Sequence, residues 1–370
     1  MEPFKNIYSQ AFFDQFTNVM AEVVTSFNTK QFLTEIFDAS WDDRELKQRM
    51  RHTTEVLHKQ LSRDYKKDIA DLLRFMRVWD DKAVKVGQYD SLAFMFLADY
   101  VELYGLDDFE TSMMATEVIT PFTSCEFSIR PFIIKYPEKG MKQMLAWSKH
   151  ENLHVRRLAS EGCRPRLPWA MALPGLKKDP TLILPILENL KNDTSEYVRR
   201  SVANNLNDIA KDNPETVIET AKRWKGETKE TDWVVKHACR TLLKQGNQEL
   251  MGLFGFGSIK DINIKNFNLL TSRVRIGEAL AFRFELENRS EVVTKIRLEY
   301  NIYYMKANGK LAPKVFKISE KDYETDSTTI IERKQSFKII TTRKFHLGEH
   351  QVALVINGNE LDKYNFELIQ

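Results

Sequence analysis

Cysteine is scarce in this sequence. The 370 residues include three cysteines, Cys125, Cys163 and Cys239, which are widely separated and form no C-x-x-C pair. An odd and scattered set of cysteines argues against both a disulfide framework and a structural zinc site. The composition therefore favours a reducing compartment, and we expect a cytoplasmic protein that holds no metal or other cofactor.

Long apolar runs are also lacking, as is a strong charge of either sign. We expect neither a targeting segment nor a membrane span, because no basic stretch precedes an apolar core and no apolar stretch is long enough to cross a bilayer. The formal net charge is +3, from 55 basic and 52 acidic residues. Any nucleic-acid surface must therefore come from local clusters of basic residues.

The first two thirds of the chain show the periodicity of amphipathic helices. Helical spacing of apolar residues continues to about Gly246, and a chain of this length favours two domains. Ser40 and Asp43 have the spacing of a capping box, which predicts a helix that begins at about Trp41.

An internal repeat appears when three segments are aligned on a valine. The offsets between the valines are 43 and 37 residues, close to the period of about 40 residues found in HEAT-type helix pairs. Each valine lies three positions after a residue that can cap a helix N-terminus. The three pairs are Asn152 and Val155, Ser195 and Val198, and Asp232 and Val235. We therefore predict an α-helical repeat solenoid.

Basic residues follow each of these valines. Stacked repeats would present them in register, as a ridge that binds DNA phosphates. A solvated charged face, or a helical-repeat scaffold that binds only proteins, fits the same spacing. The candidate DNA-binding residues are Arg156, Arg157, Arg164, Arg166, Arg199, Arg200, Lys236 and Arg240.

The pattern changes after a glycine-rich run at residues 246–257, which should break helices and mark a linker. Beyond it apolar and polar residues alternate, as in Leu280, Phe282 and Phe284, and Asn-Gly pairs at 308 and 357 signal hairpin turns. Roughly seven short strands are typical of an immunoglobulin-like β-sandwich. We expect a helical-repeat domain at 1–257 and an all-β sandwich at 258–370.

His150 to His154 match the H-E-x-x-H pattern of zinc proteases, which requires both histidines on one face of a continuous helix. The repeat places an N-cap at Asn152, so His150 should lie in the preceding turn. We therefore interpret the match as fortuitous and predict no zinc site.

The segment at 157–169, R-L-A-S-E-G-C-R-P-R-L-P-W, is the most unusual in the chain. A helix from Leu153 should stop before Pro165 and leave Trp169 on a rigid loop, where its ring can stack on a sugar or a cationic base. A core tryptophan is an equally good interpretation. Taken alone, Glu161 fits a surface charge.

Two further carboxylates have ordinary explanations as well. Asp208 shares a polar helix face with Asn204 and Asn205, and Glu126 stands near a helix start, where it would complement the helix dipole.

Taken together, residues 41–52, 157–169 and 198–208 resemble the AlkC branch of the HEAT-like-repeat alkylpurine DNA glycosylases. The resemblance covers nearly the whole chain, and many members of that branch carry a C-terminal immunoglobulin-like domain. It implies that Glu126, Glu161, Trp169 and Asp208 are the catalytic residues.

The same resemblance implies that the protein excises 3-methyladenine and 3-methylcytosine from double-stranded DNA without base flipping. We expect it to act as a monomer. The base is cationic, so it leaves as a neutral molecule with little help from an acid. A carboxylate such as Glu161 or Asp208 would stabilise the oxocarbenium-like sugar and orient water, and Trp169 would stack on the sugar.

Three alternatives remain at the level of sequence. A non-catalytic scaffold predicts a buried Trp169, a DNA-binding protein without catalysis predicts loss of the carboxylates, and a metalloprotease requires zinc. The β domain would serve either as a clamp on the duplex or as a brace between domains.

Overall fold

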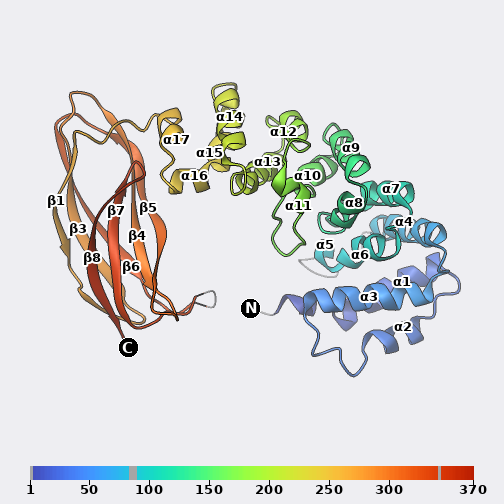
Figure 1. Ribbon diagram of the computed structural model, residues 1–370. Coiled ribbons are helices and arrows are strands. Elements are labelled where there is room, and N and C mark those ends of the chain that lie inside the picture. Colours follow the sequence, from blue (N-terminus) through green and yellow to red (C-terminus); the bar gives the residue numbers. More distant parts are fainter. Residues whose placement is uncertain (1–2, 83–89, 341–342) are drawn as a thin grey trace. The chain divides into compact units, whose positions relative to one another are not determined.

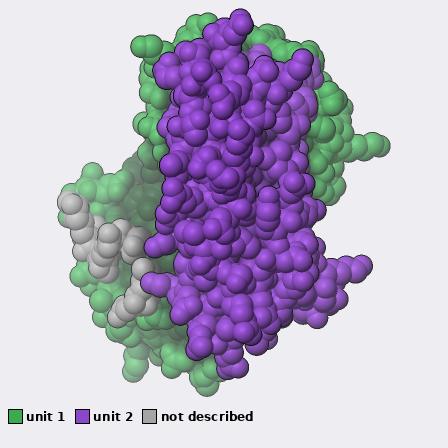
Figure 2. Space-filling model, turned by 90° about the vertical axis from the view of Figure 1, so that its left-hand side faces the viewer, with its two compact units in different colours: residues 1–238 green, residues 239–370 purple. Residues whose placement is uncertain are grey.

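The computed structural model describes residues 3–82, 90–340 and 343–370 (Figure 1). The chain divides into two compact units, residues 1–238 and 239–370, which Figure 2 shows in green and purple. No helix in the described part of the chain is long and apolar enough to cross a membrane.

Unit 1 is built from helices. After a short 3-10 helix at Phe4–Ile7, its helices are α1 Gln10–Val23, α2 Thr29–Ile36, α3 Leu46–Gln60, α4 Tyr65–Asp81, α5 Asp90–Ala93, α6 Met95–Tyr104, α7 Phe109–Ile119, α8 Ile129–Lys135, α9 Pro137–Trp147, α10 Leu153–Glu161, α11 Pro174–Lys178, α12 Leu184–Leu190, α13 Glu196–Ile209, α14 Pro214–Trp224 and α15 Lys229–Ala238.

Unit 2 begins with two short helices and continues with strands. They are α16 Arg240–Lys244, α17 Gln248–Leu253, β1 Ile262–Leu269, β2 Arg273–Arg275, β3 Ala279–Asn288, β4 Thr294–Met305, β5 Leu311–Tyr323, β6 Ser327–Ser336, β7 Gly348–Ile356 and β8 Asn359–Ile369. The architecture is thus a helical unit followed by an immunoglobulin-like strand unit, as the sequence predicts.

The helix starts follow from capping residues, with two corrections to the sequence-based prediction. Asn152 caps α10 with its side chain, which accepts a hydrogen bond from the His154 amide at 2.8 Å, and Ser195 stands at the N-cap of α13. Asp232 is wrong as an N-cap, because α15 begins at Lys229 and places Asp232 within its first turn.

The second correction concerns α3, which begins at Leu46 and not at about Trp41. Its capping box joins Glu45 and Gln48, whose side chain accepts a hydrogen bond from the Glu45 amide at 2.7 Å. Trp41 is instead buried beside Phe13 and Phe37.

The glycine-rich run also differs from the prediction, because it contains helix α17. Gly246 and Gly255 have positive φ angles of 74° and 76° and follow the C-caps of α16 and α17, so they end these helices as expected. A Cβ atom on Gly246 would lie 2.5 Å from the Gly358 carbonyl, so this turn packs backbone against backbone on the β7–β8 hairpin.

The strands form two sheets with the orders β1-β3-β6 and β2-β8-β7-β4-β5. Alternation places one face of each central strand in a shared apolar core, including Leu280, Phe282 and Phe284 of β3 and Val352 and Leu354 of β7. Asn357 and Gly358 both adopt positive φ, as a tight hairpin between β7 and β8 requires.

Candidate active site

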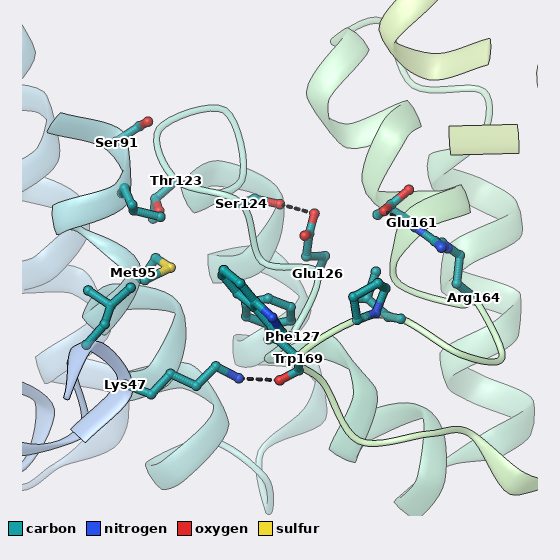
Figure 3. A pocket seen from close by; sticks show the side chains of 14 residues that line it. Lys47, Ser91, Met95, Thr123, Ser124, Glu126, Phe127, Glu161, Arg164 and Trp169 are labelled. Atoms are coloured by element: carbon teal, nitrogen blue, oxygen red, sulfur yellow. Dashed lines mark hydrogen bonds and ion pairs between the residues drawn. The ribbon is translucent and has the colours of Figure 1, made fainter. Parts of the chain in front are cut away.

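A cleft of about 460 Å³ lies within unit 1, between α3, α5, α6, the end of α10 and the loops that precede α8 and follow α10. Figure 3 shows the side chains that line it. They are Leu46, Lys47, Ser91, Leu92, Met95, Thr123, Ser124, Glu126, Phe127, Glu161, Arg164, Leu167, Pro168 and Trp169. The cleft therefore brings together three of the four residues predicted to be catalytic.

Trp169 stands on a loop that its flanking prolines keep out of helical conformation. Helix α10 ends at Glu161, as predicted, and Trp169 has a positive φ of 65°, which a bulky side chain rarely adopts. Its side chain is 78% exposed, which excludes the interpretation as a core tryptophan. The loop is closed by a hydrogen bond from the Leu173 amide to the Pro165 carbonyl, and Lys47 donates to the Trp169 carbonyl across the cleft.

Glu161 has hydrogen-bond donors on both carboxylate oxygens. Its Oε1 accepts from Arg164 Nη1 at 2.6 Å, and its Oε2 accepts from the Ser201 hydroxyl at 2.5 Å. The residue is 5% exposed, so its charge lies in a low-dielectric wall of the cleft.

Asp208 is 2% exposed and is not among the residues that line the cleft. Its Oδ2 accepts from Arg164 Nε at 2.8 Å, and Lys211 pairs with Oδ1 at 2.9 Å. Arg164 is thus held between two carboxylates. Burial lowers the pKa of Arg164, but Glu161 and Asp208 outweigh it and raise that pKa above its ordinary value. Asp208 therefore reaches the cleft only through Arg164.

Glu126 lies four residues before Arg130, in the turn that precedes α8. Its Oε2 accepts from Arg157 Nη1 at 2.5 Å and from the Ser124 hydroxyl at 2.8 Å. Oε1 has no hydrogen-bond donor among the described residues. Burial lowers the pKa of Arg157, yet the nearby Glu126 and Glu161 raise it overall. Glu126 is therefore a charged side chain at the cleft with one open acceptor oxygen.

The zinc-protease pattern does not form a ligand set. His150 lies between α9 and α10, where its Nδ1 accepts a hydrogen bond from the Asn152 amide at 2.9 Å, while His154 stands in the first turn of α10. No group of three possible metal ligands occurs among the described residues.

Known proteins match both units. The family described as DNA alkylation repair enzyme matches residues 117–242, and the C-terminal Ig-like domain of uncharacterised protein YhaZ matches residues 263–370. Uncharacterized protein YhaZ of Bacillus subtilis is 40% identical over 368 residues, which cover 100% of both chains. The alkylpurine DNA glycosylase AlkC of Pseudomonas fluorescens, solved bound to DNA containing an abasic site analog, is 36% identical over 100% of both chains, with a TM-score of 0.92.

The chain belongs to the AlkC family of alkylpurine DNA glycosylases. It is a DNA glycosylase of alkylation repair, and the strand unit is the Ig-like domain of that family. The family assignment excludes the non-catalytic scaffold, in agreement with the exposed Trp169.

In this AlkC-family chain the paired arginines have divided roles. Arg156 and Arg199 each donate through Nη1 to the backbone carbonyls six and five residues earlier, at distances of 2.6 to 3.0 Å. The first arginine of each pair therefore holds the turn that precedes its own helix. The second arginines differ: Arg157 is held by Glu126, whereas Arg200 is 61% exposed and pairs with Glu196 within α13.

The other predicted DNA-binding residues are distributed differently. Arg164 is buried between Glu161 and Asp208, and Arg166 is exposed with a two-point contact to Asp212. Lys236 is exposed on α15, and Arg240 is half-buried in α16.

Sequence reasoning missed several residues that shape the site. Lys47 crosses the cleft from α3, with its ammonium 4.6 Å from the centre of the Phe127 ring. Ser201 binds Glu161, and Arg130 is a fully buried cation behind the Trp169 loop. Each acts on a partner at least 32 residues away, so no local spacing signals its role.

Proposed function

We propose that this AlkC-family enzyme hydrolyses the N-glycosidic bond of cationic N3-alkylated bases, 3-methyladenine and 3-methylcytosine, in double-stranded DNA. The observation that carries the proposal is the pairing of an exposed indole, Trp169, with two carboxylates, Glu126 and Glu161, around one cleft. The AlkC relative was solved with an abasic site analog, which is the kind of product that base excision leaves.

The charge of the substrate determines what the cleft must supply. An N3-alkylated base departs as a neutral molecule, so the reaction needs no proton donor on the base. The sugar that remains acquires positive, oxocarbenium-like charge, and preorganised negative charge close to it lowers the barrier. The carboxylates of Glu126 and Glu161 meet this need.

The two carboxylates are suited to different tasks. Glu126 Oε1 has no donor among the described residues, so it is free to accept a hydrogen bond from the attacking water. Glu161 has both oxygens occupied and is fixed in position, which suits it to stabilising the charge on the sugar. Asp208 holds Arg164 and so keeps Glu161 oriented.

Trp169 contributes a rigid aromatic surface. The strained backbone and the Lys47 contact hold its indole in an exposed position, where the ring face attracts a cationic base or an oxocarbenium-like sugar. An aromatic group presented outside the core favours contact with the lesion at the surface of the duplex, which supports excision without base flipping.

Affinity for DNA would come from the exposed basic residues of the helical unit. Arg166, Arg200 and Lys236 are exposed and are the best candidates for phosphate contacts. Arg156 and Arg199 would contribute to DNA binding indirectly, by holding the turns that precede α10 and α13.

The test is release of free 3-methyladenine and 3-methylcytosine from methylated duplex DNA by the intact protein and by Glu126→Gln. We expect release by the intact protein and a rate lower by on the order of 10²-fold in the variant, with duplex affinity retained, because the amide keeps the shape but is a weaker acceptor for water. No release by folded, intact protein would overturn the proposed substrate class. An unchanged rate in Glu126→Gln would remove Glu126 from the mechanism.

A further inference from the structure

Arg130 is a fully buried arginine without a carboxylate partner. It lies in the first turn of α8, is 0% exposed and forms no ion pair with a described residue. Burial lowers its pKa to about 10 and neighbouring Arg164 lowers it further, whereas Cys163, Asp208 and Glu161 act in the opposite direction. Burying a cation that forms no ion pair is unfavourable for folding, so its presence here calls for a specific role.

The hydrogen bonds of Arg130 show what it connects. Its Nε donates to the Met171 carbonyl at 2.7 Å, and its Nη1 donates to the Gly162 carbonyl at 2.9 Å. Gly162 directly follows Glu161 at the end of α10, and Met171 lies two residues after Trp169. One planar guanidinium therefore joins the segment that carries Glu161 to the loop that carries Trp169.

The packing around Arg130 leaves little room for adjustment. A Cβ atom on Gly162 would lie 2.7 Å from Ile129 Cγ2, so the end of α10 rests directly against the start of α8. Arg130 Nη2 is buried and has no hydrogen-bond partner among the described residues. The guanidinium is thus held in one orientation by its two carbonyl contacts and by close packing.

We propose that Arg130 is a positioning residue that sets the distance and orientation of Trp169 relative to Glu161. This inference rests on the proposed function of these two side chains. A lysine has one nitrogen at the end of a flexible chain and cannot span both carbonyls, whereas the arginine fork reaches both at once. The stacking surface and the charge-stabilising carboxylate are thereby kept in register with the same sugar.

The main experiment compares Arg130→Lys with Arg49→Lys. Arg49 is a matched control, since it is also buried and also donates to two backbone carbonyls, those of Arg44 and Lys5. We expect Arg130→Lys to slow single-turnover base release by on the order of 10- to 100-fold with duplex affinity changed less than about twofold. Arg49→Lys should leave the rate within about twofold. Equal rates in intact protein and Arg130→Lys would overturn the proposal.

A double variant separates positioning from a general loss of structure. If Arg130 acts by placing Trp169, its effect should nearly vanish once the indole is absent, so Arg130→Lys added to Trp169→Ala should slow release by no more than about twofold further. A fully additive loss would show that Arg130 acts on general stability and would overturn the proposal.

A third measurement does not depend on activity. Release of the loop from Arg130 should speed tryptic cleavage after Arg166, detected by mass spectrometry, in Arg130→Lys and not in Arg49→Lys. If intact protein released no base, the proposed function would fail while this measurement still tested the connection. Unchanged cleavage after Arg166 would count against Arg130 as the residue that holds the loop.

Discussion

Each unit of this protein buries an arginine between two carboxylates, and the surroundings of the two networks differ. In the helical unit Arg164 joins Glu161 and Asp208. In the strand unit Arg297 joins Glu299 at 2.6 Å and Glu320 at 3.1 Å. Glu161 lines a cleft, whereas Glu299 is 0% exposed within β4, the strand that is paired on both sides by β5 and β7.

The comparison shows that a buried ion-pair network is not by itself a sign of catalysis. Charged groups that are paired inside a protein can serve the fold alone, because removal of one partner leaves the other uncompensated. The helical network differs in that Glu161 also borders open space and lies on the same cleft as an exposed, strained Trp169, which is why we propose a chemical role for it. In the strand unit, by contrast, Glu299 is fully buried and does not border open space.

The sharpest test of this comparison is the same substitution in both networks. We expect Glu161→Gln to lower the single-turnover rate of base release by on the order of 10²- to 10³-fold with duplex affinity largely retained, because the negative charge near the sugar is lost. Glu299→Gln should leave the rate within about twofold and destabilise the fold by about 1–3 kcal/mol, measured by thermal unfolding. Comparable rate losses in the two variants would break the distinction.

We expect an effect of intermediate size on duplex binding when exposed arginines of the two units are replaced. Arg200→Ala should weaken duplex binding about 3- to 10-fold and reduce the slope of log affinity against log salt by about 1, as for a phosphate contact. Arg289, an exposed arginine of the strand unit, is the control, and Arg289→Ala should change affinity less than about twofold. Titration at several salt concentrations checks both, and equal losses would show that the strand unit contacts phosphate as well.

The smallest effect concerns the strained backbone that sets the helical site apart. Trp169→Gly and Trp169→Ala both remove the indole and should slow base release similarly. Glycine adopts a φ of 65° without the Cβ clash, so Trp169→Gly should be more stable than Trp169→Ala by about 1 kcal/mol in thermal unfolding. Equal stability would show that the loop relaxes once the indole is gone.

Much of the fold follows from local sequence, with instructive exceptions. The N-cap positions of Asn152 and Ser195 and the end of α10 before Pro165 agree with the prediction, and the Asn152 side chain, though not that of Ser195, caps a backbone amide of its helix. The start of α3 was placed too early because Ser40 and Asp43 imitate a capping box, whereas burial of Trp41 against Phe13 favours a loop there. Tertiary packing overrode a local signal.

At the candidate active site, too, the sequence predicts residue types but not how they are paired. Sequence resemblance names Glu126, Glu161, Trp169 and Asp208 as candidate site residues, but it does not reveal that Asp208 stands behind Arg164 or that Arg156 and Arg199 hold turns. The two arginines of each pair are adjacent in the sequence and follow a valine in the same way. Spacing along the chain therefore does not reveal which arginine of a pair faces a backbone carbonyl.

The sequence by itself therefore determined the helical and strand units, some of the helix ends and the residue types available at the site, because these depend on periodicity and on neighbours in the chain. Only the tertiary structure decided how those residues are paired. The contacts of Glu161 with Ser201, of Arg164 with Asp208 and of Arg130 with Met171 join positions 40 to 44 residues apart. Such contacts depend on how one helix packs against the next, and that packing brings the indole and the carboxylates to a single cleft.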